Sequence, residues 1–263
     1  MHIAWYPTRF IDLLLDMKVE KARARLAAPP ADLTRGKLRG TWVMGHELAG
    51  ILAHRGEPAA EQREALRVGA AAGAAMFRAF AASEPLMVRV WAQPVEITPQ
   101  AHFSLAGVKE WMEVLGVLAM LGDHETAGLL ADIGADAPAK ALQYPAYCLP
   151  LAECWGQLVA ERDWRDAHAQ AVEASTQLDD PGSFFHHRDA PMLRAIAALG
   201  ARDPEAFDQA AADFFNGHKT LYASEDRAPE ALISPIGLGI LALAQRADLP
   251  CSVSSDFAPL LDG

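Results

Sequence analysis

The chain has 263 residues, of which 51% are hydrophobic and 22% are charged, so it can bury a large core and is expected to be globular. Its formal net charge of −11 disfavours long-range attraction to nucleic acid or to an anionic membrane, and is compatible with a basic protein partner. The apolar runs are too short to cross a bilayer, and charged residues stand where a secretory signal would be apolar, so we expect a cytoplasmic protein.

The charge is unevenly distributed along the chain. Residues 1–60 carry a net charge of +3, whereas the remaining residues carry −14. Acidic helical surfaces often serve only to keep a protein in solution. The acidic surplus therefore has two interpretations, solvation and attraction to a basic partner.

The N-terminal portion, residues 1–86, is predicted to be helical. Apolar residues are set among charges in 9–27, and a second helix is expected over 41–54. The alanine-rich stretch 61–81 predicts a long helix whose small residues let neighbouring backbones approach closely.

Residues 87–98 depart from this helical pattern. β-branched and aromatic side chains flank Gln93 and Pro94 there, which is typical of strands rather than helices. We therefore expect a short β-hairpin or an extended crossover in this segment.

Helical hairpins are predicted from residue 103 onward. Residues 108–121 are apolar around most of the helix circumference, which requires that the helix be buried. Asp123 then stands at an N-cap position, and a more amphipathic helix follows it. Asp163 and Asp203 repeat this break at intervals of 40 residues, each between an apolar and an amphipathic helix.

Helix pairs at this period are typical of tetratricopeptide-like and HEAT-like arrays, although these pairs share no consensus. We therefore predict an all-α fold of stacked antiparallel helical hairpins. No flexible linker divides the chain, so residues 1–263 are expected to form a single all-helical domain in which 1–86 pack on the hairpins of 103–263.

Four further segments complete the prediction. Residues 177–191 contain a cluster of turn residues and are expected to form a loop. In the helix 204–216, we expect Ala206 to face inward with the other apolar residues, and we expect the acidic residues to form the solvent-exposed face. A last apolar helix is expected over 231–247, and residues 257–261 are expected to fold back on the array.

Motifs that support catalysis are mostly missing from the sequence. His46 and Glu47 begin like a metalloprotease helix, but glycine stands where the second histidine belongs, and His54 does not complete a zinc site. Gly237 and Gly239 lie in an apolar helical run, which favours close packing over nucleotide binding. We therefore predict no catalytic, cofactor-binding or metal-binding residue and no enzymatic activity.

The densest titratable cluster in the sequence comprises His186, His187, Arg188 and Asp189. It matches the His-Asp pair of metal-dependent phosphohydrolases only in part, because the adjacent His-Asp dipeptide is missing. One interpretation is a polar loop whose histidines hydrogen-bond locally. A helical metal-dependent hydrolase that uses His186, His187 and Asp189 is the second.

Several short motifs occur in a fixed order from residue 103 onward. They are Val108-Lys109-Glu110-Trp111 through Leu121-Gly122-Asp123, Asp203-Pro204-Glu205-Ala206-Phe207, Phe215-Asn216-Gly217-His218-Lys219 with Tyr222, the apolar run 233–244, and Phe257-Ala258-Pro259-Leu260-Leu261. This order resembles the Imm49 family of immunity proteins from bacterial polymorphic-toxin systems. The resemblance implies a cytoplasmic protein without catalytic activity that binds one cognate toxin domain and blocks its active site or its partner surface.

No set of functional residues transfers from that resemblance by motif, because recognition surfaces of immunity proteins diverge with their toxins. From the acidic surplus we predict toxin contacts at Asp208 and Asp213 on the acidic helix, and at Glu225 and Asp226 in the charged loop after it. The alternative role of these four residues is solvation. A tetratricopeptide-like scaffold that binds a peptide would share the fold and is the alternative function.

Overall fold

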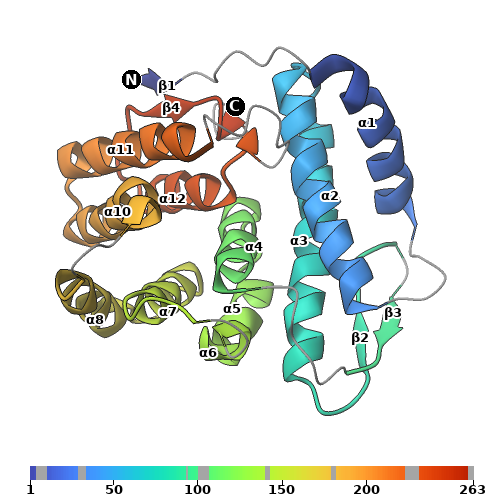
Figure 1. The fold of residues 1–263 in the computed structure, drawn as a ribbon, viewed down its shortest axis with the longest axis horizontal. Helices are drawn as coiled ribbons and strands as arrows, with labels where there is room; N and C mark the ends of the chain where they lie inside the picture. Colours follow the sequence, from blue (N-terminus) through green and yellow to red (C-terminus); the bar gives the residue numbers. More distant parts are fainter. Residues whose placement is uncertain are drawn as a thin grey trace.

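The computed structural model describes residues 1–3, 11–28, 34–92, 94–99, 107–139, 143–178, 182–222 and 231–259. Within these ranges the chain is mostly helical, and its strands form two short two-stranded sheets. Figure 1 shows the N-terminal helices on one side and the C-terminal helices on the other, with α4 between them. The predicted all-α fold with a short β-hairpin is confirmed.

Three helices form the N-terminal portion, α1 (Ile11–Ala27), α2 (Arg35–His54) and α3 (Ala59–Ala81). α2 begins earlier than predicted, because the Thr34 side chain accepts a 3.3 Å hydrogen bond from the Lys37 amide and caps the helix. The expected close approach of α3 is confirmed at Gly45 and Gly69. A Cβ atom on Gly45 would lie 2.7 Å from the Gly69 Cα, so α2 and α3 can cross this closely only with glycine there.

The predicted hairpin is present as β2 (Leu86–Val88) and β3 (Val95–Ile97), which pair antiparallel. A second pair joins the two ends of the described chain. In it, β1 (His2–Ile3) runs parallel to β4 (Ser254–Ser255). This pairing places the C-terminal segment beside the first residues, as Figure 1 shows.

The three predicted helical hairpins are confirmed. They are α4 (Val108–Leu121) with α5 (His124–Ile133), α7 (Cys148–Val159) with α8 (Arg165–Thr176), and α10 (Ala190–Ala201) with α11 (Pro204–Tyr222), while the short α6 (Asp136–Ala139) lies between the first two hairpins. Asp123 accepts a 3.1 Å hydrogen bond from the Thr126 amide, and Asp203 accepts one of the same length from Ala206. Asp163 accepts a 3.2 Å bond from the Arg165 amide. Each aspartate thus satisfies a free amide where an amphipathic helix begins.

The prediction of a loop over 177–191 is wrong from residue 182 onward. α9 (Gly182–Phe184) continues into the π-helix η1 (Phe185–Asp189), which continues into α10. Tertiary contacts stabilise this turn, because Phe185 packs edge-on against Tyr147 at 4.9 Å and the Tyr147 hydroxyl bonds the Asp189 carboxylate. These partners lie far away in the sequence, so composition alone indicated only a turn.

α12 (Pro235–Arg246) returns to the centre of the molecule and packs against α4. It begins at Pro235 rather than at 231, because the Ser234 hydroxyl caps it by accepting a bond from the Gly237 amide. A Cβ atom on Gly239 would lie 2.7 Å from the Gly116 Cα, so these glycines permit the close packing that the sequence indicated.

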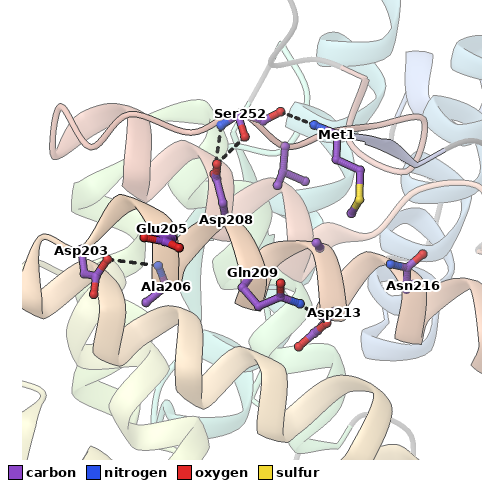
Figure 2. A pocket seen from close by; sticks show the side chains of 11 residues that line it. Met1, Asp203, Glu205, Ala206, Asp208, Gln209, Asp213, Asn216 and Ser252 are labelled. Carbon is purple, nitrogen blue, oxygen red and sulfur yellow. Dashed lines mark hydrogen bonds between the residues drawn. The ribbon is translucent and has the colours of Figure 1, made fainter.

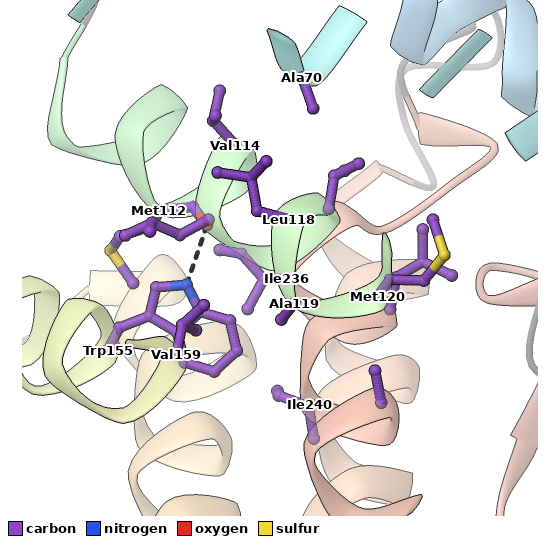
Figure 3. Packing of buried hydrophobic residues seen from close by; sticks show 14 of the residues in the cluster. Ala70, Met112, Val114, Leu118, Ala119, Met120, Trp155, Val159, Ile236 and Ile240 are labelled. Atoms are coloured by element: carbon purple, nitrogen blue, oxygen red, sulfur yellow. Dashed lines mark hydrogen bonds between the residues drawn. The ribbon is translucent and has the colours of Figure 1, made fainter. Parts of the chain in front are cut away.

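The core runs through α4, which contacts α3, α7 and α12. Figure 3 shows Val114 and Leu118 of α4 among residues of these three helices, with the Trp155 indole donating a 2.9 Å hydrogen bond to the Met112 carbonyl. Phe257 is fully buried and its carbonyl accepts a 2.8 Å bond from the Ser234 amide, so the predicted return of the chain is confirmed up to residue 259. Residues 260 and 261 lie outside the described ranges. No helix in the described ranges combines the length and apolar character needed to cross a membrane.

Candidate functional site

A groove of about 710 Å³ opens along the outer face of α11, and the segment before β4 forms its opposite wall. It is lined by Met1, Asp203, Glu205, Ala206, Asp208, Gln209, Ala212, Asp213, Asn216, Ser252 and Val253. Four of these side chains are carboxylates, and none is a lysine or arginine. We refer to this surface, shown in Figure 2, as the acidic groove.

The amphipathic character of α11 produces the acidic groove. Asp203 caps the helix, Pro204 has no amide hydrogen to leave unsatisfied at the first helical position, and Glu205 lies in the first turn. The buried side of α11 packs on α10, η1 and α12, and its residues are Phe207, Ala210, Ala211, Ala212, Phe214, Phe215, Gly217 and His218. The prediction that Ala206 faces inward is wrong, because Ala206 is exposed in the first turn, before the helix enters the core.

Asp208, one of the predicted contact residues, fixes the opposite wall of the acidic groove. Its carboxylate accepts a 2.9 Å hydrogen bond from the Ser252 amide and a second bond from the Ser252 hydroxyl. Burial raises the pKa of the Asp208 carboxyl, but the hydrogen bonds from Ser252, the Cys251 thiol and the N-terminal ammonium together lower it by more, so its pKa lies below the usual value. Asp208 therefore carries a negative charge at neutral pH and also holds the C-terminal segment against α11.

Asp213, the second predicted contact residue, lies further along the same face of α11. Its carboxylate forms a 2.9 Å ion pair with Arg194 of α10 and accepts a 2.8 Å hydrogen bond from the Gln209 amide group. Both ionic side chains are partly exposed to solvent, so the ion pair is weak and a stronger cationic partner can displace it. Asp213 is thus charged but partly neutralised.

Glu205 is an exposed carboxylate of the acidic groove that was not predicted as a contact. Among the described residues its side chain has no ion-pair or hydrogen-bond partner. Helical spacing was the signal that could have identified it, because Glu205 lies three and four residues before Asp208 and Gln209 on one face. Glu225 and Asp226, the other predicted contacts, lie outside the described residues.

The titratable cluster of η1 is arranged differently from a metal site. Asp189 is 1% exposed, and its carboxylate accepts bonds from the Tyr147 hydroxyl at 2.8 Å and from the Arg188 guanidinium at 2.6 Å. His186 is exposed. In the part of the chain that the structure describes, no three His, Cys, Asp or Glu side chains are grouped so that they could hold a metal ion.

Two buried histidines, His46 and His218, bind backbone carbonyl groups. His46 is buried, with its Nε2 atom 3.2 Å from the Ile233 carbonyl oxygen, and the His218 Nε2 atom lies 3.0 Å from the Ala231 carbonyl oxygen. Both therefore anchor the segment that precedes α12. His46 therefore has a structural role in the fold.

A model of one protein family, described as immunity protein 49, matches residues 56–260 of the chain. The matched region contains α3 to α12 and every residue of the acidic groove except Met1. No curated protein matches the chain, and no solved structure does.

Proposed function

This chain belongs to the immunity protein 49 family, and from that membership we propose that it binds a cognate bacterial toxin domain and neutralises it by protein–protein contact. The acidic groove is the proposed contact surface. The toxin would present a basic surface there, with lysine or arginine side chains next to the carboxylates of α11. Neutralisation in this proposal requires no chemical step by the chain itself, and it takes place in the cytoplasm.

The observation that carries the proposal is the concentration of carboxylates in the acidic groove. Asp203, Glu205, Asp208 and Asp213 lie along one helix, and no lysine or arginine lines the surface between them. The N-terminal ammonium of Met1, which donates to the Ser252 carbonyl, is a positive charge at this surface, so the carboxylates outnumber it. A concave surface with such a negative surplus strengthens the local potential and accelerates association with a protein of opposite charge. Three of these carboxylates are already bonded within the chain, because Asp203 caps α11, Asp208 bonds Ser252 and Asp213 pairs with Arg194. Glu205 is therefore the most available partner for an incoming cation.

The support for a rigid binding surface comes from the packing under α11. Phe207, Phe214 and Phe215 are almost fully buried, and the buried apolar cluster is continuous from α1 to α12. A preorganised surface loses little conformational entropy when a partner binds. The same continuity supports our proposal that residues 1–263 act as a single domain.

The test is co-purification of the chain with the product of the adjacent gene, followed by titration with that product at two salt concentrations. We expect the Glu205→Lys variant to weaken binding at least tenfold at low salt, because the reversed charge repels a basic partner. The loss should diminish as salt screens the charges.

Glu173→Lys is the matched control, because Glu173 is also exposed on a helix but lies on α8, outside the acidic groove. It should bind the toxin as the wild type does. If Glu205→Lys bound the toxin as tightly as the wild type does, the acidic groove would not be the contact surface. A chain that neither binds the neighbouring toxin nor protects cells from it would overturn the proposed function itself, and selective binding of basic peptides would then favour a scaffold.

A further inference from the structure

A small pocket of about 220 Å³ lies between α3, α4, α5 and the strand β2, away from the acidic groove. The pocket is lined by Arg67, Ala71, Ala74, Ala75, Arg78, Val88, Arg89, Leu118, Leu121, Asp123 and Thr126. Three of these eleven residues are arginines, in a chain whose formal net charge is −11.

The three arginines differ in how far they are already engaged. Arg67 forms a two-bond ion pair with Glu64, with distances of 2.7 Å and 2.6 Å. Arg78 is half-buried near the end of α3, and Arg89 is exposed after β2. Among the described residues, neither Arg78 nor Arg89 has an ion-pair or hydrogen-bond partner for its side chain.

The pocket also receives the N-terminus of α5, where the helix dipole is positive. Asp123 caps this helix by accepting the 3.1 Å bond from the Thr126 amide, so its carboxylate already occupies part of the positive end. The Thr126 side chain adds a hydroxyl to the lining. With Arg67 balanced by Glu64, and Asp123 offsetting one further charge, a positive charge is left over at the pocket.

The size of the pocket limits the ligand. Sites for drug-sized ligands usually measure about 300–1,000 Å³, so about 220 Å³ suits a small anion or one anionic group of a larger molecule. Guanidinium groups match the oxygens of a phosphate in geometry and charge, and they bind it through paired hydrogen bonds. We propose that this pocket binds a phosphate group, free or as a phosphate monoester, held by Arg78 and Arg89 at the N-terminus of α5.

The experiment is calorimetric titration of the full chain with inorganic phosphate, with sodium chloride holding the ionic strength constant. We expect a Kd of about 1 mM or lower for the wild type, and a loss of about tenfold for each of Arg78→Gln and Arg89→Gln. Arg165→Gln is the matched control, because Arg165 is an exposed arginine on α8 outside the pocket, and it should bind as the wild type does.

Asp123→Asn provides a test in the opposite direction. Asparagine keeps the helix cap but removes the negative charge, so phosphate should bind more tightly to this variant than to the wild type. Phosphate titration of Asp123→Asn also tests the proposal if the Arg78→Gln variant does not fold. Melting temperatures and far-ultraviolet circular dichroism establish which variants are folded.

Glycerol 3-phosphate and acetate separate the possible sources of the anion. Inorganic phosphate and glycerol 3-phosphate should both bind, with the ester favoured if the site recognises a phosphorylated metabolite, and acetate should bind more weakly than either. Acetate binding as tightly as phosphate would overturn the assignment. So would the absence of phosphate binding, or equal binding by the Arg78→Gln Arg89→Gln double variant. None of these outcomes affects the proposed toxin contact, which uses another surface.

Discussion

The hydroxyl of Tyr147 donates a 2.8 Å hydrogen bond to the carboxylate of Asp189, which lies 42 residues later in the chain. The bond joins the start of α7 to the π-helix η1, and the Arg188 guanidinium pairs with the same carboxylate. π-helical turns are rare and are often found at functional sites. In this chain, the buried carboxylate and its two partners give that turn a structural role.

Removing the Tyr147 hydroxyl and removing the charge of Asp189 should destabilise the fold by different amounts. Tyr147→Phe removes one bond to Asp189 and should cost about 1–2 kcal/mol. Asp189→Asn leaves the largely buried Arg188 guanidinium without its counter-ion and should cost about 3 kcal/mol. Urea unfolding measures both. Tyr222→Phe is the control, because its hydroxyl accepts a bond from Lys109 at an exposed position. If Tyr222→Phe lost as much stability as Tyr147→Phe, the structural role of the buried bond to Asp189 would be contradicted.

The contact between α4 and α12 should not tolerate a methyl group at Gly116. A Cβ atom there would collide with the Pro235 carbonyl and lie 3.1 Å from the Ile236 Cα, so Gly116→Ala should destabilise the fold by about 1–3 kcal/mol. Gly40→Ala is the matched control in α2, where no atom lies within 4 Å of the new Cβ. It should stabilise the fold by about 0.5–1 kcal/mol, because alanine is the better helix former. Thermal unfolding measures both changes: the melting temperature should fall for Gly116→Ala and rise for Gly40→Ala.

The stability of the fold should fall between about pH 6.5 and pH 4 because of His218. Burial lowers the pKa of His218 to about 4, although its bond to the Ala231 carbonyl opposes this shift; His46, Lys109 and Arg188 lower it further. The unfolded chain, with a histidine pKa near 6.5, therefore binds more protons than the folded chain within this window. Unfolding becomes easier as the pH falls, by about 3 kcal/mol in total from this residue.

Chemical unfolding from pH 7 down to pH 4 measures the effect of His218. His218→Gln retains a donor for the Ala231 carbonyl but cannot be protonated, so its stability should depend less on pH across that window. His186→Gln serves as the control, since His186 is exposed and should leave the pH dependence unchanged. If the stability of His218→Gln fell with pH as the wild type does, protonation of His218 would not be the cause of the fall.

The aspartates between paired helices should differ in their contribution to stability. Asp203 caps α11 through the Ala206 amide, so Asp203→Ala should cost about 1 kcal/mol. Asp163 is exposed and, among the residues that the structure describes, bonds only Arg165, two residues later, so Asp163→Ala should change stability by less than about 0.5 kcal/mol. Denaturation midpoints of the two variants measure the two losses of stability. A larger loss for Asp163→Ala than for Asp203→Ala would contradict the prediction.

The sequence alone indicated one part of the candidate site and missed another. Asp208 and Asp213 were predicted because they are acidic residues on the polar side of one helix, and both line the acidic groove. The sequence did not indicate that Ser252, 44 residues later, forms the opposite wall by donating to Asp208. Nor did it indicate that Arg78, Arg89 and Asp123 line one pocket, since they lie on separate elements.

By itself, the sequence determined most of the helices and the aspartate breaks between the paired ones. Asp123 and Asp203 cap helices through amides three residues later, and the β-branched runs around Pro94 form a hairpin, so each feature depends on neighbours within a few residues. Only the tertiary structure decided that α12 packs on α4 and that residues 182–189 are helical. Those outcomes depend on which apolar faces fit together, and on buried bonds between residues far apart in the chain, which a local pattern does not encode.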